Sequence, residues 1–111
     1  MILRLYTGND GQTHFEEVTL PEAEMHRVAL KAGADMTFRQ SPDGAFSDWH
    51  NAPRRQYVII LSGGMEIGTG DGSKRNLGPG DIVLADDLTG QGHTTATVNG
   101  PRLTASIPLP D

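Results

Sequence analysis

The sequence predicts an all-β domain that folds as a sandwich or a barrel. Short apolar runs and alternating apolar and polar residues are interrupted by Gly, Pro, Asn or Asp about every eight to twelve residues. The 111-residue chain contains 14 Gly and 7 Pro, which provide the turns that many short strands require. Apolar residues make up 36% of the chain and charged residues 21%, a balance typical of a folded protein and not of a disordered acidic tail.

The length of the chain limits it to one structural unit. A chain of 111 residues is long enough for one hydrophobic core and too short for two. No internal repeat and no linker interrupts the pattern. We therefore predict a single domain that spans residues 1–111.

Periodicity and turn residues together place the predicted strands. In chain order these are Ile2–Tyr6, Thr13–Leu20, Met36–Gln40, Phe46–His50, Gln56–Leu61, Met65–Gly68, Lys74–Leu77, Ile82–Ala85, His93–Val98 and Leu103–Ile107. The segments Asn9-Asp10-Gly11 and Asp71-Gly72 favour tight hairpins, because Asn, Asp and Gly tolerate the positive φ that such turns need.

Three segments allow two interpretations each. Pro21–Gly33 fits a short helix through its 3.6-residue stripe and a strand through its alternation. The glycines of 68–72 resemble a phosphate-binding loop, but no strand-to-helix context surrounds them, so we favour a hairpin. In Thr89–His93, Gly90 and Gly92 either let the backbone bulge so that His93 enters the interior, which we favour, or form an ordinary loop.

Charge and composition exclude several classes of partner. The net charge is −5, and the only basic clusters are Arg54-Arg55 and Lys74-Arg75, so we expect neither nucleic acid nor an anionic membrane as partner. No apolar run approaches the roughly 20 residues of a membrane-spanning helix. The chain has no Cys and no signal-peptide pattern, so we expect a cytoplasmic protein.

Two spaced motifs carry the residues that could perform chemistry. The first contains His50, then Ala52, then Gln56, and closes at Gly63. The second opens at Gly80-Asp81, continues through Asp86 and Leu88, and ends at His93.

The two motifs resemble the two-part signature of the cupins, and the chain is similar to small single-domain cupins of the RmlC-like jelly-roll superfamily. In that family the first motif usually has His at the position of Ala52 and Glu at that of Gln56. The second motif usually has its His two residues before the place of His93. The resemblance implies a double-stranded β-helix, the cupin jelly-roll barrel, with polar side chains from distant strands around an internal pocket.

The resemblance also implies a metal site. A divalent transition metal (Fe, Mn, Ni or Zn) would be held by His50, Gln56 and His93. Ala52 offers no ligand atom and Gln56 only a neutral amide oxygen, so this set would hold a metal more weakly than the family's own ligands do. The alternative is a metal-free pocket lined by two hydrogen-bonded histidines.

The ligand that we expect is a small organic molecule that carries a carboxylate. Arg54, or its neighbour Arg55, could pair with that carboxylate, and Phe38 could line the mouth of the pocket. The adjacent Asp86 and Asp87 could act as a proton-transfer pair, but neighbours in a strand point apart, so we favour a solvated acidic turn.

Two functions follow from this. The first is a cupin that binds a small molecule in a pocket inside its barrel and that could, with a metal bound, act as an enzyme of the oxygenase, isomerase or lyase type. The alternative is a metal-free binding or sensor module, because Gln56 cannot serve as a general base. We also expect a homodimer that forms through an outer face or through the exchange of a terminal strand such as Ile2–Tyr6.

Overall fold

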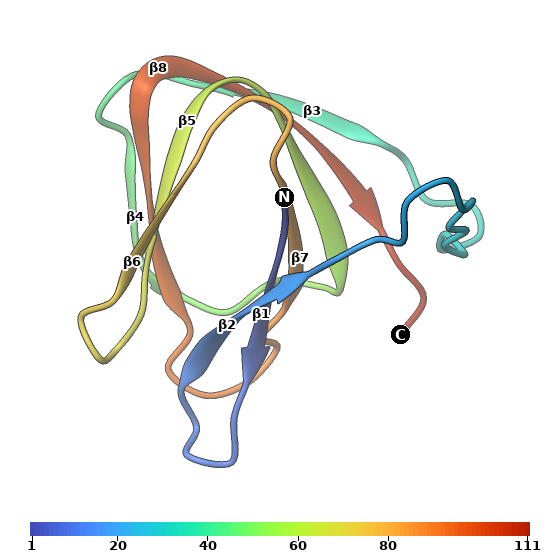
Figure 1. The fold of residues 1–111 in the computed structure, drawn as a ribbon. Coiled ribbons are helices and arrows are strands. Elements are labelled where there is room, and N and C mark those ends of the chain that lie inside the picture. Colours follow the sequence, from blue (N-terminus) through green and yellow to red (C-terminus); the bar gives the residue numbers. More distant parts are fainter.

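The computed structural model describes residues 1–111 and contains strands but no helix (Figure 1). Its strands are β1 (Ile2–Thr7), β2 (Thr13–Val18), β3 (Thr37–Ser41), β4 (Phe46–His50), β5 (Gln56–Gly68), β6 (Lys74–Leu77), β7 (Ile82–Asp86) and β8 (His93–Pro108). They form one open, mixed sheet in the order β2-β1-β7-β5-β8-β3, with β4 added to β8 and β6 added to β5. The predicted all-β class is confirmed.

The two long strands, β5 and β8, divide the sheet into two layers. The first part of β5 pairs with β7 and with the C-terminal part of β8, whereas its last residues pair with β6 and with the N-terminal part of β8. β3 and β4 extend the C-terminal and N-terminal parts of β8 respectively. In Figure 1, β5 and β8 bend over the top of the molecule from one layer to the other. The sheet therefore folds back on itself around an interior.

The bend in β5 coincides with a glycine at which any side chain would be strained. The register between β5 and β8 shifts between Ile60 and Gly64. Gly63 has a φ of 73°, and a Cβ at this position would lie 2.5 Å from the carbonyl oxygen of Pro101 and 2.8 Å from Cα of Arg102. The closing glycine of the first motif thus serves the geometry of the bend.

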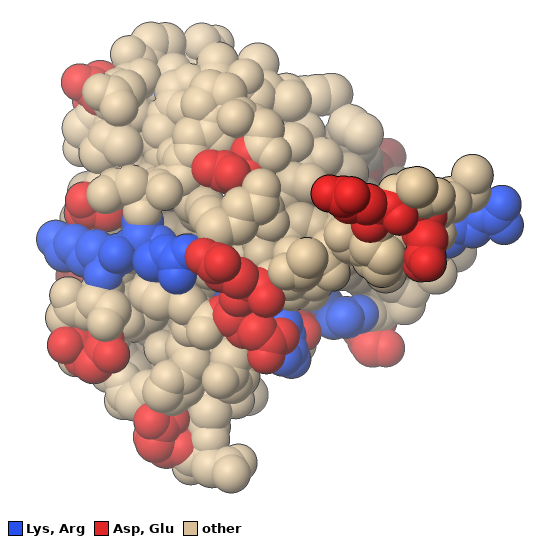
Figure 2. All heavy atoms as spheres, viewed as in Figure 1, with Lys and Arg blue, Asp and Glu red and all other residues tan.

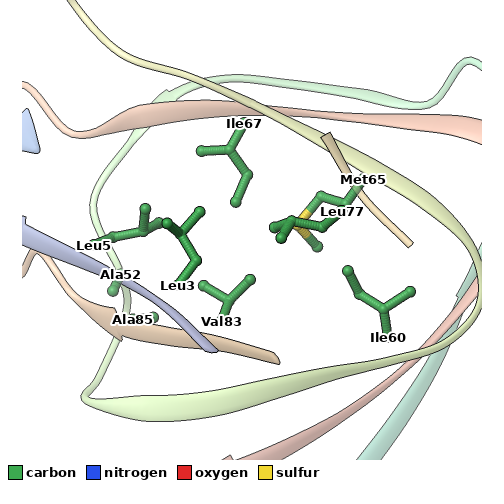
Figure 3. Close-up of a cluster of buried hydrophobic side chains, with 9 residues drawn as sticks. All are labelled: Leu3, Leu5, Ala52, Ile60, Met65, Ile67, Leu77, Val83 and Ala85. Atoms are coloured by element: carbon green, nitrogen blue, oxygen red, sulfur yellow. The ribbon is translucent and has the colours of Figure 1, made fainter. Parts of the chain in front are cut away.

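The core fills the space between the layers. Nine buried apolar residues form one cluster (Figure 3): Leu3, Leu5, Ala52, Ile60, Met65, Ile67, Leu77, Val83 and Ala85. β1 and β7 run parallel and in register, so Leu3 faces inward beside Val83, and Leu5 beside Ala85. This alternation fixes which face of each strand lines the interior.

The structure merges strands that the sequence predicts as separate. Gln56–Leu61 and Met65–Gly68 belong to β5, and His93–Val98 and Leu103–Ile107 belong to β8. The glycines between the members of each pair bend a continuous strand and do not end it. Pro21–Gly33 forms neither a helix nor a strand, and the whole segment is exposed.

The N-terminal strand does not offer an open edge. β1 pairs with β2 on one side and with β7 on the other, so both of its edges are already bonded. β3 lies at the end of the sheet order instead, and four of its five residues are exposed.

Two further features of the structure are the charges on its surface and the lengths of its elements. Basic and acidic atoms are interspersed on the face shown in Figure 2, which has no broad basic area. No helix of the structure has the length and apolar character needed to cross a membrane.

Candidate functional site

A cavity of about 340 Å³ lies between the two layers. Its apolar floor consists of buried side chains from β1, β5 and β7: Leu5, Met65, Ile67, Val83 and Ala85. Polar side chains from β3, β4, β5 and β8 form the rest of the wall, and exposed residues such as Phe46 and Pro53 lie at its rim. The cavity is therefore apolar in its depth and polar on one side.

The structure brings the three residues of the predicted metal site to this cavity. His50 ends β4, Gln56 begins β5 and His93 begins β8, and all three side chains line the wall. His50 and His93 are direct partners in the β4–β8 register, and their ring centroids are 4.5 Å apart. The strand ends thus place two imidazoles from distant parts of the sequence side by side.

A buried carboxylate orients His93. Nδ1 of His93 donates a hydrogen bond to Oδ2 of Asp87 over 2.5 Å, and Oγ1 of Thr13 donates to the same oxygen over 2.8 Å. The side chain of Asp87 is fully buried and that of His93 is 7% exposed. The carboxylate accepts the hydrogen bond that the Nδ1–H group donates. Nε2 of His93 is therefore available to a ligand in the cavity.

His50 is oriented in the same way by the backbone. Its Nδ1 lies 2.7 Å from the carbonyl oxygen of Asp48, which can only accept, so Nδ1 must carry the proton. No hydrogen bond within the protein uses Nε2 of either ring. The structure therefore holds both imidazoles in one tautomer, with Nε2 available to a ligand.

The solvated acidic turn that we favoured for Asp86 and Asp87 is wrong. Asp86 accepts hydrogen bonds from Arg4 and Arg55 on the outer face, at 3.2 and 2.9 Å. Asp87 continues the inward alternation of Val83 and Ala85 and is completely buried, with Oδ1 lacking any hydrogen-bond partner. The two carboxylates do point apart, but one of them points into the protein.

The glycines before His93 form a tight loop and not a bulge inside a strand. Gly90 and Gly92 have φ values of 78° and 79°, and both precede the start of β8. A Cβ on Gly92 would overlap the backbone of His50. Nδ2 of Asn51 donates to the carbonyl oxygens of Thr89 and Gly90, at 2.8 and 3.0 Å, which fastens the loop to the end of β4.

The cavity also contains two arginines that the sequence analysis did not select. Arg39 of β3 and Arg102 of β8 both line it, beside Ser41 and Thr104. Nε and Nη1 of Arg102 are buried and have no hydrogen-bond partner. Burial, and after it the positive charge of Arg39, holds the pKa of Arg102 below its usual value.

The two residues proposed from the sequence for ligand contact lie outside the cavity. Phe38 is 63% exposed, and Arg54 is exposed in the segment between β4 and β5. Neither belongs to the cavity wall. The side chains of a strand alternate, so Arg39, next to Phe38, faces the cavity, whereas the apolar residues of this segment favour Phe38 as the inward residue.

The cavity holds no conventional cluster of metal ligands. No group of three or more His, Cys, Asp or Glu side chains is placed to hold a metal ion. Ala52 is buried in the wall, and Gln56 is the polar side chain of the first motif that accompanies the two imidazoles.

Comparison with known proteins assigns the chain to no family, since no family model and no curated protein matches it. Among solved structures, the chain is similar to a conserved protein of unknown function from Streptococcus pyogenes. The identity is 17%, 96% of each chain is covered, and the TM-score is 0.49. The residues of the cavity are therefore the basis for inferring a function.

Proposed function

We propose that this protein is a small single-domain cupin that binds a small organic molecule in the cavity between its layers. The single observation that carries the proposal is the pair His50 and His93, whose Nε2 atoms have no partner in the protein and whose rings line an enclosed wall. A cavity of about 340 Å³ lies near the lower end of the usual range for ligand sites. The ligand is accordingly small.

The path of the chain supports the jelly-roll assignment. Each long strand contributes to both layers, which is how a double-stranded β-helix wraps one chain around one interior. The residues of the two motifs, far apart in the sequence, approach each other at the ends of β4 and β8. The shifted position of His93 is compensated by the loop that contains Gly90 and Gly92.

The donor atoms fit a weakly held divalent transition metal. Nδ1 of each imidazole donates to an oxygen behind it, an arrangement common for histidines that ligate metals through Nε2. His50, His93 and Gln56 would hold the ion, which when bound would polarise an oxygen of the substrate as a Lewis acid. Asp87 and Asp48 would keep the two rings in the ligating tautomer.

The second candidate is a metal-free binding module. It is favoured because His50 and His93 are not joined by a third His, Cys, Asp or Glu side chain placed to hold a metal ion with them. In this case the two Nε2 atoms accept hydrogen bonds from hydroxyl or amino groups of the ligand. The apolar floor would contact its hydrocarbon part.

Nitrogen NMR of the imidazole rings tests both candidates on untagged protein. Long-range proton–nitrogen spectra report Nε2 of His50 and His93, and the exposed His26 serves as an internal control. A set of neutral organic fragments should shift the signals of His50, His93 and the methyl groups of Ile67, and leave His26 unchanged. Fragments that bind without moving these signals would contradict the proposed function.

A zinc titration of the same samples distinguishes the candidates. If the metal site exists, Zn²⁺ shifts Nε2 of both rings, and Gln56→Glu tightens binding about tenfold or more by adding a charged oxygen. If Zn²⁺ moves neither ring at neutral pH, the metal-free module is the correct one. Equal affinity of the wild type and the variant would show that residue 56 is not a ligand.

A further inference from the structure

We propose that the cavity contains an oxyanion subsite formed by Arg102 and Arg39, and that the ligand is a small organic acid. The inference rests on the proposed function, because it names the chemical class of the molecule that the cavity holds. The subsite lies on β8 and β3, where Arg102 is paired in register with Ser41, and Arg39 with Thr104.

Unpartnered donors are the first argument. A guanidinium group has five N–H donors in a planar fork and no acceptor. In Arg102 both Nε and Nη1 are buried without a hydrogen-bond partner, although buried polar groups are nearly always bonded. A guanidinium binds two oxygens of a carboxylate or a phosphate through Nε with Nη2 or through Nη1 with Nη2, so the two unpartnered donors of Arg102 belong to these two neighbouring edges.

The charges around the cavity are the second argument. The ionisable side chains of its wall are Arg39, Arg102, His50 and His93, and no carboxylate is among them. This is unexpected in a chain with a net charge of −5. Of the five arginines outside the cavity, Arg4 and Arg55 share Asp86 and Arg75 pairs with Glu17, whereas Arg27 and Arg54 are exposed to solvent.

The repulsion between the two arginines is the third argument. Burial, and after it the positive charge of Arg39, disfavours the charged form of Arg102 and lowers its pKa. An anion placed between the two guanidinium groups would remove the repulsion and occupy the free donors at once. The hydroxyl groups of Ser41 and Thr104 on the same wall offer further donors.

Isothermal titration at low ionic strength tests the subsite with defined probes. Succinate supplies carboxylates, inorganic phosphate supplies the other oxyanion, and succinamide is the neutral counterpart of succinate. We expect succinate to bind, and succinamide to bind at least tenfold more weakly. If phosphate binds and succinate does not, the oxyanion subsite is supported and the organic acid is wrong. The ligand would then be a molecule that carries a phosphate.

Substitutions assign the binding to Arg102. Arg102→Gln should weaken succinate binding tenfold or more, and Arg102→Lys should weaken it less, since it keeps the charge and loses the fork. Arg54→Gln, which removes an exposed charge outside the cavity, should change the affinity less than twofold. Equal effects of Arg102→Gln and Arg54→Gln would overturn the proposal.

Thermal unfolding without ligand provides a second measurement. A buried guanidinium without a hydrogen-bond partner destabilises the ligand-free protein. Arg102→Gln should therefore keep or raise the melting temperature of the ligand-free protein. A fall of many degrees would show that Arg102 has a structural role and would overturn the proposal. If succinate and succinamide bind equally while neutral fragments move His50 and His93, the anion subsite fails and the proposed function stands.

Discussion

Asp87 shows how one residue can organise a site that the motifs only outline. Its Oδ2 accepts hydrogen bonds from Thr13 and His93, so it connects β2 to the first residue of β8. The approach of the two distant histidines could be predicted from the resemblance of the two motifs to a known two-part signature. The carboxylate behind His93 was missed because two adjacent aspartates suggest a polar turn, whereas strand alternation sends one of them inward.

Replacing Asp87 should destabilise the protein much more than replacing its neighbour. Asp87→Ala leaves Nδ1 of His93 and Oγ1 of Thr13 buried without acceptors, which should lower the free energy of unfolding by about 3 kcal/mol. Asp86→Ala removes partly exposed ion pairs on the outer face and should cost about 1 kcal/mol or less. Urea denaturation of the two variants measures the difference, and equal losses would contradict the role given to Asp87.

At the scale of elements, the alternation along each strand could be predicted well and the continuity of the strands poorly. Gly63 was predicted as the end of a motif and as a break between strands. In the structure Gly63 lies at the bend of β5. There β8 approaches so closely that a side chain on Gly63 would collide with the backbone of β8. A sequence shows that a glycine is present, but it does not show whether the chain turns back or only bends there.

Two glycine-to-alanine substitutions measure how much the close packing at this bend contributes to the stability of the protein. Gly63→Ala places a Cβ against the backbone of Pro101 and Arg102 at a φ of 73°, so it should cost several kcal/mol, about twice or more the cost at a free turn. Gly72→Ala imposes a similar φ of 85° but meets open space, so it should cost about 1 kcal/mol. Equal melting temperatures for the two variants would contradict the close packing at the bend.

At the scale of the whole molecule, the sequence predicted the fold class and an internal polar site but not the charge of that site. Arg39 and Arg102 are separated by 63 positions and belong to strands that pair only in the folded sheet, and neither lies in a motif. The homodimer through an outer face or an exchanged terminal strand stays a prediction, and β3, which ends the sheet order and is mostly exposed, is an open edge of the sheet.

A crystal structure of the protein with succinate tests the central claim most directly. The account predicts one succinate in the cavity, with a carboxylate about 2.7–2.9 Å from Nε and an Nη of Arg102 and the rest of the molecule directed towards His50 and His93. Density confined to the outer surface, or donors of Arg102 satisfied by another protein group with the cavity empty, would contradict it.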